Sequence, residues 1–199
     1  MPDYLARCLT TWRIFHPDWE FTLWTPEKLP ELRHQVYFDD PRRWSPQSHP
    51  GQYRANLARY ELLYDLGGVW VDCDLQCLRP IHTLLAGVTC FAAWEKQNRW
   101  INNAFIGCTP GHPAMAAILD GIPASIESQP GKRSNWQTGA RYITPILETR
   151  RDVRIFDQPL IYPYSYRELE RGGEEFPNAY AVHHWANARR QRQLEVPLV

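Results

Sequence analysis

Asp72 and Asp74 lie two residues apart, directly after an apolar run at residues 69–71. If the chain stays extended there, both carboxylates point to one side, and Cys73 between them points the other way, into the protein. Carboxylates this close repel each other, and a divalent cation that prefers oxygen ligands, such as Mg²⁺ or Mn²⁺, removes the repulsion. The spacing therefore predicts a metal-binding pair.

The elements around the two aspartates make this prediction more specific, because aspartates in loops more often cap turns or face solvent. Residues 52–66 carry apolar side chains at helical spacing, and Gly67-Gly68 ends that helix where the backbone must turn left-handed. We expect residues 69–72 to follow as a buried strand. The acids would then stand at the C-terminal end of a strand, where open α/β sheets bind ligands.

Asn56 and Arg59 are three residues apart on the expected helix and therefore share a face. If the helix packs beneath the strand, both side chains reach the same cleft. Arg59 would there pair with a carboxylate or with a sugar hydroxyl. A salt bridge on the helix surface explains Arg59 equally well from spacing alone.

The rest of the chain alternates helical and strand patterns, which predicts an α/β fold with a mixed sheet in a single domain, residues 1–199. We expect further helices at 4–15, with Asp3 as N-cap, at 112–127, and at 139–149, with a kink or break at Pro145. The expected strands are 20–24, 88–94, 105–108, 153–156 and 180–183. Residues 38–51 have the composition of an exposed loop, and residues from 186 on are expected outside the core.

Composition excludes several classes of protein. Lys plus Arg equals Asp plus Glu, at 22 each, so no net charge attracts nucleic acid. No apolar run is long enough for a transmembrane segment, and no signal peptide is recognisable. The five cysteines lack Cys-x-x-Cys spacing, which argues against a disulfide framework or a zinc site. We expect a cytoplasmic protein, with peripheral contact to a membrane as the second option.

The run from Arg54 to Asp74, RANLARYELLYDLGGVWVDCD, resembles the signature of glycosyltransferase family 32, the glycosyltransferases with a DXD sugar-binding region. This family includes capsular polysaccharide enzymes and fungal α-mannosyltransferases. The similarity continues in NNAFIG at 102–107, PGHP at 110–113, Thr138-Gly139 with Thr144, and AVHHW at 181–185. The resemblance implies a GT-A-like, Rossmann-like fold and a retaining, metal-dependent transfer of a hexose. The donor would be a UDP- or GDP-hexose, and the acceptor a glycan or a lipid-linked acceptor.

Matched by position, the resemblance also assigns roles at the metal. Asp74 would be the main metal ligand, and Asp72 would touch both the metal and the donor, so these two carry the catalytic role. His184, or as the second choice His183, would complete the metal shell or meet the diphosphate. The metal would be Mn²⁺ or Mg²⁺.

The same comparison assigns the donor-binding residues. Asn56 and Arg59 would hold hydroxyl groups of the donor sugar, Asn103 would line the sugar pocket, and Gly68 would lie in the donor site beside Asp72.

Three departures from the family pattern stand out. Ala55-Asn56 replaces the usual Ser-Asp, which removes a charge from the sugar site. Ala188-Arg189 stands where relatives often carry Ser-Trp. The chain begins just after the place of the family's first apolar strand, so we expect a sheet without that strand. Either the true start lies upstream, or the nucleobase pocket is impaired or built differently.

Two other functions fit the same residues. A catalytically impaired relative would bind a nucleotide sugar without transferring it. A metal-dependent phosphodiester hydrolase would also use an acidic pair, but such sites cluster further acidic or histidine ligands. Only His183 and His184 are candidates for that, and both are remote in sequence.

Overall fold

The protein is described from a computed structural model that covers residues 2–40 and 48–197. The helices are α1 (Asp3–Phe15), α2 (Gln35–Asp39), α3 (Pro50–Leu66), α4 (His82–Leu85), α5 (Pro113–Ser128), α6 (Ser134–Gln137), α7 (Ala140–Leu147), α8 (Gln158–Ile161) and α9 (Ala186–Gln191), with short 3₁₀ turns η1 (Pro26–Lys28) and η3 (Leu169–Gly173). The strands are β1 (Gly68–Val71), β2 (Leu75–Cys77), β3 (Cys90–Lys96), β4 (Trp100–Cys108), β5 (Arg154–Phe156) and β6 (Ala181–His183).

The strands form two sheets. The larger has the order β1-β4-β3-β5, in which β4 runs antiparallel to β1 and β3 while β5 runs parallel to β3. The smaller pairs β2 with β6, antiparallel. The predicted α/β class with a mixed sheet flanked by helices is therefore confirmed. Within the described residues, no helix combines the length and apolar character needed to span a bilayer.

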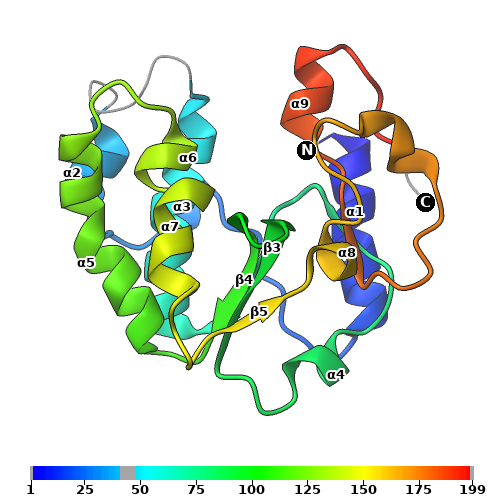
Figure 1. Cartoon of the computed structure of the whole chain (residues 1–199), viewed down its shortest axis with the longest axis horizontal. Coiled ribbons are helices and arrows are strands. Elements are labelled where there is room, and N and C mark those ends of the chain that lie inside the picture. Colours follow the sequence, from blue (N-terminus) through cyan, green and yellow to red (C-terminus); the bar gives the residue numbers. More distant parts are fainter. Residues whose placement is uncertain (1, 41–47, 198–199) are drawn as a thin grey trace.

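The larger sheet separates two hydrophobic cores. Successive residues of β3 alternate between them: Cys90 and Ala92 belong to one core, and Phe91 and Ala93 to the other. Helices α2, α3, α5, α6 and α7 lie on one side of the sheet, and α1, α4, α8 and α9 lie on the other (Figure 1). Both faces of this sheet are thus covered.

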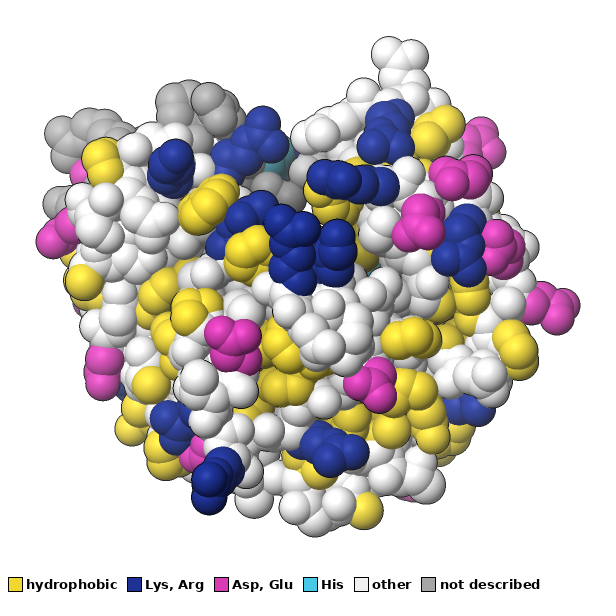
Figure 2. Space-filling view, viewed as in Figure 1, with side chains coloured by type: hydrophobic (Ala, Val, Ile, Leu, Met, Phe, Trp, Pro, Cys, Tyr) yellow, Lys and Arg dark blue, Asp and Glu magenta, His cyan; other side chains and the backbone are white. Residues whose placement is uncertain are grey.

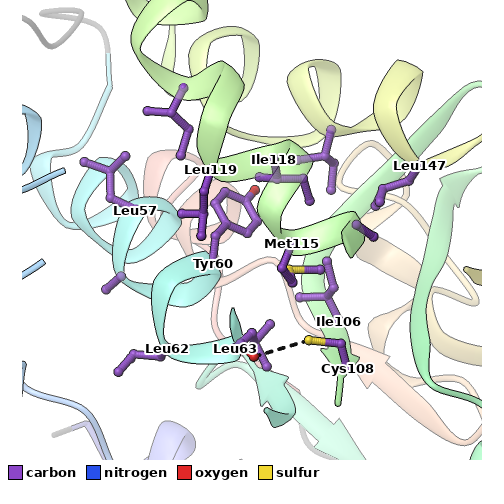
Figure 3. Close-up of a cluster of buried hydrophobic side chains, with 14 of the residues drawn as sticks. Leu57, Tyr60, Leu62, Leu63, Ile106, Cys108, Met115, Ile118, Leu119 and Leu147 are labelled. Carbon is purple, nitrogen blue, oxygen red and sulfur yellow. Dashed lines mark hydrogen bonds between the residues drawn. The ribbon is translucent and has the colours of Figure 1, made fainter. Parts of the chain in front are cut away.

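The core beneath α3 fixes that helix against the sheet. Leu57 and Leu63 of α3 pack with Met115 and Leu119 of α5 and with Ile106 of β4 (Figure 3). All five side chains are at most 3% exposed, and burying each large aliphatic side chain contributes about 1.5–3 kcal/mol. The cluster holds the helix that carries Asn56 and Arg59.

The glycines between α3 and β1 have a steric cause. Gly67 has φ +70° and donates its N–H to the Leu63 carbonyl, which closes the helix. A Cβ at Gly67 would lie 2.8 Å from the backbone nitrogen of Pro110. Gly68 also has a positive φ, +94°. Only glycine combines a positive φ with room for the Pro110 backbone at this position without strain. The predicted glycine turn is confirmed.

Several local predictions need correction. Residues 20–24 form no strand and join neither sheet, because Phe21 and Trp24 pack against the two different cores instead. Asp3 is the first residue of α1 rather than its N-cap, which is Pro2. Helix α7 runs through Pro145 without a break and ends two residues later. Of the loop expected at 38–51, residues 41–47 lie outside the described residues, and its two ends belong to α2 and α3.

The C-terminal segment is more deeply anchored than predicted. Arg189 of α9 is 4% exposed. Its guanidinium donates to the carbonyls of His184, Leu169 and Glu195, at 2.8, 2.6 and 3.0 Å. The polar composition of this segment did not indicate that Arg189 is buried, because a buried arginine needs tertiary partners that the local sequence does not reveal.

Candidate functional site

Asp72 and Asp74 lie in a tight turn between β1 and β2, not in an extended strand. The Asp72 carbonyl accepts a hydrogen bond from the N–H of Leu75 at 2.9 Å, which closes the turn. Strand β1 is half-buried rather than buried, and Cys73 is exposed rather than turned inward. The two carboxylates converge all the same, together with His183: one ligand atom from each lies within 4.8 Å of the others.

A bulge in β4 lies next to Asp72. Ala92 of β3 pairs with Ile106 and the next residue, Ala93, pairs with Asn102, so the register skips residues 103–105. The Asn103 carbonyl, in the skipped stretch, accepts from Arg59, and the Ala104 carbonyl continues the ladder to β1 by accepting from the N–H of Asp72 at 2.9 Å. Bulges of this kind redirect backbone and side chains next to functional sites.

Arg59 of α3 holds Asp72 in place. Its Nη2 lies 2.6 Å from Asp72 Oδ1, and its Nη1 donates to the carbonyl of Asn103 in the bulge at 2.7 Å. The Arg59 side chain is 2% exposed, and its guanidinium lies 5.1 Å from the ring centre of Trp70. The Trp70 Nε1 also donates to Asp72 Oδ1, at 2.8 Å. Arg59 is therefore no surface residue: it fixes the orientation of the first carboxylate.

Asp74 is held from the C-terminal end of the chain. Its Oδ1 lies 3.1 Å from Nε2 of His183, and its Oδ2 accepts from the N–H of Ala186 at 2.8 Å. Burial would raise the pKa of Asp74, but the charge of His183 and the hydrogen bonds from His183 and Ala186 lower it to about 2. Burial would lower the pKa of His183, but Asp74 outweighs it and the pKa is raised. Each group thus favours the charged form of the other, and a metal bound to His183 would take the place of the proton on its ring.

Pairing of β2 with β6 brings these distant residues together. Leu75 and His183 are register partners, so the residue after Asp74 faces the histidine strand. Trp185 then has φ +54° and ψ +44°, a left-handed conformation that is rare for a bulky residue. It turns the chain into α9 so that the N–H of Ala186 meets Asp74, and strain of this kind clusters at functional sites.

Of the two adjacent histidines, His183 faces the aspartates. His184 points away: its Nε2 lies 2.8 Å from Oε1 of Gln76, and the residue is fully buried. Burial and the charge of His183 lower the pKa of His184 to about 4, so its ring is neutral. His183, the second choice for the metal shell, therefore lies beside the two aspartates, and His184 does not. Successive residues of an extended chain point to opposite sides.

The residues of this cluster fit a divalent cation. Two carboxylates and one imidazole are donors that Mn²⁺ or Mg²⁺ accepts, with the nitrogen suiting Mn²⁺ better. Ligand atoms of one such ion lie about 3–4 Å apart, since each bond is about 2.1 Å long, so small side-chain shifts suffice. The other ring nitrogen of His183, Nδ1, is buried without a partner among the described residues. A buried polar atom left unpaired is costly and favours a further ligand at the site.

A second group of polar residues lies beside the cluster. Asn103 donates its amide to Asn56 Oδ1 at 3.0 Å and to the Tyr60 hydroxyl at 2.6 Å. Asn56 donates in turn to the hydroxyl of Thr138 at 3.1 Å, and Tyr60 donates to the Thr138 carbonyl at 2.7 Å. Asn56 and Asn103 are 7% and 8% exposed. Sequence reasoning singled out both asparagines, but neither Tyr60 nor Trp70, whose roles depend on contacts across the fold.

Gly68 is not brought to this site. It pairs with Cys108 at the opposite end of β1 from Asp72, and four strand residues correspond to about 13 Å. The role that the structure gives Gly68 is the change of direction between α3 and β1.

Glu95 is a partly buried carboxylate that the sequence analysis did not single out. Its carboxylate accepts from the Asn102 amide at 2.8 Å. Burial raises the pKa of Glu95, while the nearby charges of His183 and Arg141 partly oppose that rise. Glu95 is therefore close enough to both His183 and Arg141 to feel their charges. A single glutamate near the end of an expected strand gave no signal for this.

Comparison with known protein families matches the part of the chain that contains Asp72 and Asp74. The sequence model of a family described as "Glycosyltransferase sugar-binding region containing DXD motif" matches residues 2–103. The Asp-x-Asp of that description corresponds to residues 72–74.

Curated relatives share the same region. Inositol phosphoceramide mannosyltransferase 1 of Schizosaccharomyces pombe is 32% identical over 129 residues, which are 61% of this chain and 39% of that protein. Inositol phosphoceramide mannosyltransferase 3 of the same yeast is 32% identical over 114 residues, 54% and 30%. Mannosyl phosphorylinositol ceramide synthase SUR1 of Saccharomyces cerevisiae is 32% identical over 109 residues, 54% and 27%. The chain thus matches well under half the length of each of these relatives.

Proposed function

Because the chain belongs to the family of glycosyltransferases with a DXD sugar-binding region, we propose that it moves a hexose from a nucleotide-diphosphate sugar to a hydroxyl of an acceptor. The reaction depends on a divalent metal. The observation that carries the proposal is the convergence of Asp72, Asp74 and His183 at one turn. This cluster is the place for the diphosphate of the donor.

Each residue of the cluster has a distinct task. Asp74, ionised because its pKa is about 2, would be the main metal ligand, with His183 beside it. Asp72 would be the second ligand, held in one orientation by Arg59 and Trp70. A Mn²⁺ or Mg²⁺ ion bound there supplies Lewis-acid stabilisation of the diphosphate leaving group. Side chains that are already oriented before the reaction favour catalysis, because reorienting them during the reaction would cost free energy.

The asparagine group would hold the donor sugar. The Asn103 amide carbonyl and the second amide N–H of Asn56 remain for a sugar, while Tyr60 and Thr138 fix the two amides by hydrogen bonds. Amide groups recognise sugar hydroxyls without a charge. Two of the relatives named above are mannosyltransferases by name, so GDP-mannose is the first donor to test, followed by UDP-hexoses. Retention of the anomeric configuration follows from the family resemblance, as does a glycan or lipid-linked acceptor.

Donor turnover in the presence of Mn²⁺ tests the proposal. Asp74→Ala should lower donor hydrolysis or transfer by about a hundredfold or more, since the loss removes a transition-state contact. Asp120→Ala, on the exposed surface of α5, is the matched control and should keep full activity. Equal activity of the wild type and Asp74→Ala would refute the metal role. Nucleotide-sugar binding without turnover would indicate an impaired relative, and cleavage of a phosphodiester without an acceptor would indicate a hydrolase.

A further inference from the structure

Two tryptophans and an arginine form a stack outside the metal cluster. The guanidinium of Arg141 lies 4.1 Å from the ring centre of Trp100 and 4.2 Å from that of Trp136. Arg99 lies 5.6 Å from the Trp100 ring, and Lys132 lies 5.7 Å from the Trp136 ring. We call Trp100, Arg141 and Trp136 the platform. It presents aromatic faces and positive charge side by side.

Trp136 is the exposed member of the platform, and Trp100 and Arg141 are half-buried. The Trp136 residue is 40% exposed, and among the tryptophans that the structure describes it alone exceeds the level of a half-buried residue. Leaving a large aromatic ring in water forgoes the stabilisation that burial would give. An exposed indole ring beside cationic side chains is open to contact with a ligand.

The platform stands on rigid elements. The end of the β3–β4 hairpin is tied to α8, because Gln97 and Gln158 exchange hydrogen bonds of 3.1 Å from each backbone N–H to the other's side chain. Helix α7 is tied to β4 by the hydrogen bond from the N–H of Ile101 to Thr144 Oγ1 at 2.8 Å. Trp100 and Arg141 come from these two elements, so their spacing is fixed before any ligand binds.

Positive charge is unbalanced at this place. Among residues 2–40 and 48–197, no carboxylate lies within ion-pair distance of Arg99, Lys132 or Arg141. Figure 2 shows lysine and arginine side chains gathered over the end of the β3–β4 hairpin, beside a notch between α6 and α9. A guanidinium without a carboxylate partner is available to an anionic ligand.

The platform adjoins the asparagine group. Strand β4 carries both Trp100 of the platform and Asn103 of the asparagine group. Thr138, which lies between Trp136 and Arg141 in the sequence, contacts Asn56 of the same group. The platform and the asparagine group are therefore carried by the same segments of the chain.

We propose that the platform is the acceptor subsite, and that the acceptor is a sugar or polyol that carries an anionic group, a phosphate or a carboxylate. This inference rests on the proposed transferase function. The apolar face of a sugar ring packs on Trp136 or Trp100, as indole faces favour C–H groups, while Arg141, aided by Arg99 and Lys132, binds the anion. An anionic bilayer is the weaker match, because the platform lies at the side of a notch and adjoins the donor site.

The test compares charged and neutral sugars that are otherwise alike: mannose 6-phosphate with mannose, and glucuronate with glucose. Calorimetry gives their affinities for the Mn²⁺-loaded chain, and saturation-transfer NMR gives the ring protons in contact. The variants are Arg141→Gln, Arg141→Lys and Trp136→Ala. Arg13→Gln is the control, because Arg13 also lies over an aromatic ring, that of Phe21, but on α1. Binding of GDP and UDP with Mn²⁺ is measured in every variant, with the thermal midpoint as the check on folding.

We expect the charged sugar of each pair to bind about tenfold more tightly than the neutral one, as one charge-assisted contact provides. Arg141→Gln and Trp136→Ala should each weaken that binding about tenfold, with Arg141→Lys between them and the wild type, and with GDP and UDP binding unchanged. Equal binding of charged and neutral sugars would overturn the proposal. So would a loss of GDP or UDP binding in the platform variants, or platform-dependent binding only to vesicles of 30% phosphatidylglycerol in phosphatidylcholine.

The two proposals fail in different ways. If the wild type binds neither GDP nor UDP with Mn²⁺, the donor site is refuted. The sugar probes contain no nucleotide, so their dependence on Arg141 still supports or overturns the platform as an anionic-sugar site.

Discussion

His183 lies 109 residues after Asp74 in the sequence, yet its Nε2 is 3.1 Å from Asp74 Oδ1. The contact exists because β2 pairs with β6, with Leu75 opposite His183. The C-terminal histidine motif, residues 181–185, therefore packs against the turn that carries Asp72 and Asp74. A comparison of His183 with its neighbour His184 separates a ligand role from a structural one.

Replacing each histidine by alanine should give different results for metal binding. His183→Ala removes one of three candidate ligand atoms, so Mn²⁺ affinity should fall at least about tenfold, and the unfolding free energy should fall too, because buried Asp74 loses its partner. His184→Ala leaves a cavity at a fully buried position and removes the hydrogen bond between His184 Nε2 and Gln76 Oε1. We expect it to lose about 2 kcal/mol of unfolding free energy and to keep its Mn²⁺ affinity where it remains folded. Calorimetry and urea unfolding measure the two quantities, and reversed effects would assign the metal to His184.

The sequence was sufficient where the signals are local. The helical spacing at 52–66, the paired glycines and the apolar run before Asp72 lie within one stretch of chain, and each acts on its own neighbours. Helix α3, the turn at Gly67 and strand β1 follow these signals. The proximity of Arg59 to Asp72 follows as well, since the turn folds the strand back over the helix.

Contacts across the fold were not accessible in this way. Strand β2 has only three residues, and its pairing with β6 depends on a partner more than a hundred residues away. That pairing decides which histidine faces Asp74. The exposure of Cys73 depends on a turn that the extended-strand assumption excluded, and the burial of Arg189 depends on carbonyls that only the folded chain presents.

Arg59 offers a test of the support beneath Asp72. In Arg59→Met the side chain keeps its bulk but loses the ion pair to Asp72 and the hydrogen bond to the Asn103 carbonyl. We expect a loss of about 2–3 kcal/mol in urea unfolding, since a buried carbonyl is left unpaired. The Mn²⁺ affinity should also fall. The control Arg33→Met breaks an exposed pair with Asp65 and should cost less than about 1 kcal/mol; similar losses in both would contradict the role of Arg59.

Gly67 and Gly87 form a matched pair for the turn before β1. Both have a positive φ, +70° and +73°, but a Cβ at Gly67 would meet Pro110 at 2.6–2.9 Å, whereas a Cβ at Gly87 would meet nothing within 4 Å. Gly87→Ala should cost about 1 kcal/mol from the backbone conformation alone. Gly67→Ala should cost clearly more, about 3 kcal/mol, because the backbone of Pro110 must also shift. Urea unfolding of the two variants gives the difference, and equal costs would rule out the steric contribution.

His16 predicts how stability depends on pH. It is fully buried, with Nδ1 3.0 Å from the Trp12 carbonyl and Nε2 3.0 Å from the N–H of Ile81. Nδ1 therefore donates and Nε2 accepts, so the ring is neutral, and protonation would set an N–H against the Ile81 N–H. Burial is the main cause that lowers the pKa of His16, and the nearby charge of His82 adds to it.

The sign follows from this lowered pKa. The unfolded chain binds the proton near pH 6.5 and the folded chain only at lower pH, so the stabilisation is complete above about pH 6.5 and is lost as the pH falls below it. The unfolding free energy should decrease by up to about 1.4 kcal/mol per pH unit for this one group. In His16→Gln, whose amide can donate and accept but does not titrate, urea midpoints between pH 5 and 7.5 should show a smaller decrease. An unchanged slope in His16→Gln would assign the pH dependence to other histidines, of which His112 also has a pKa lowered by burial.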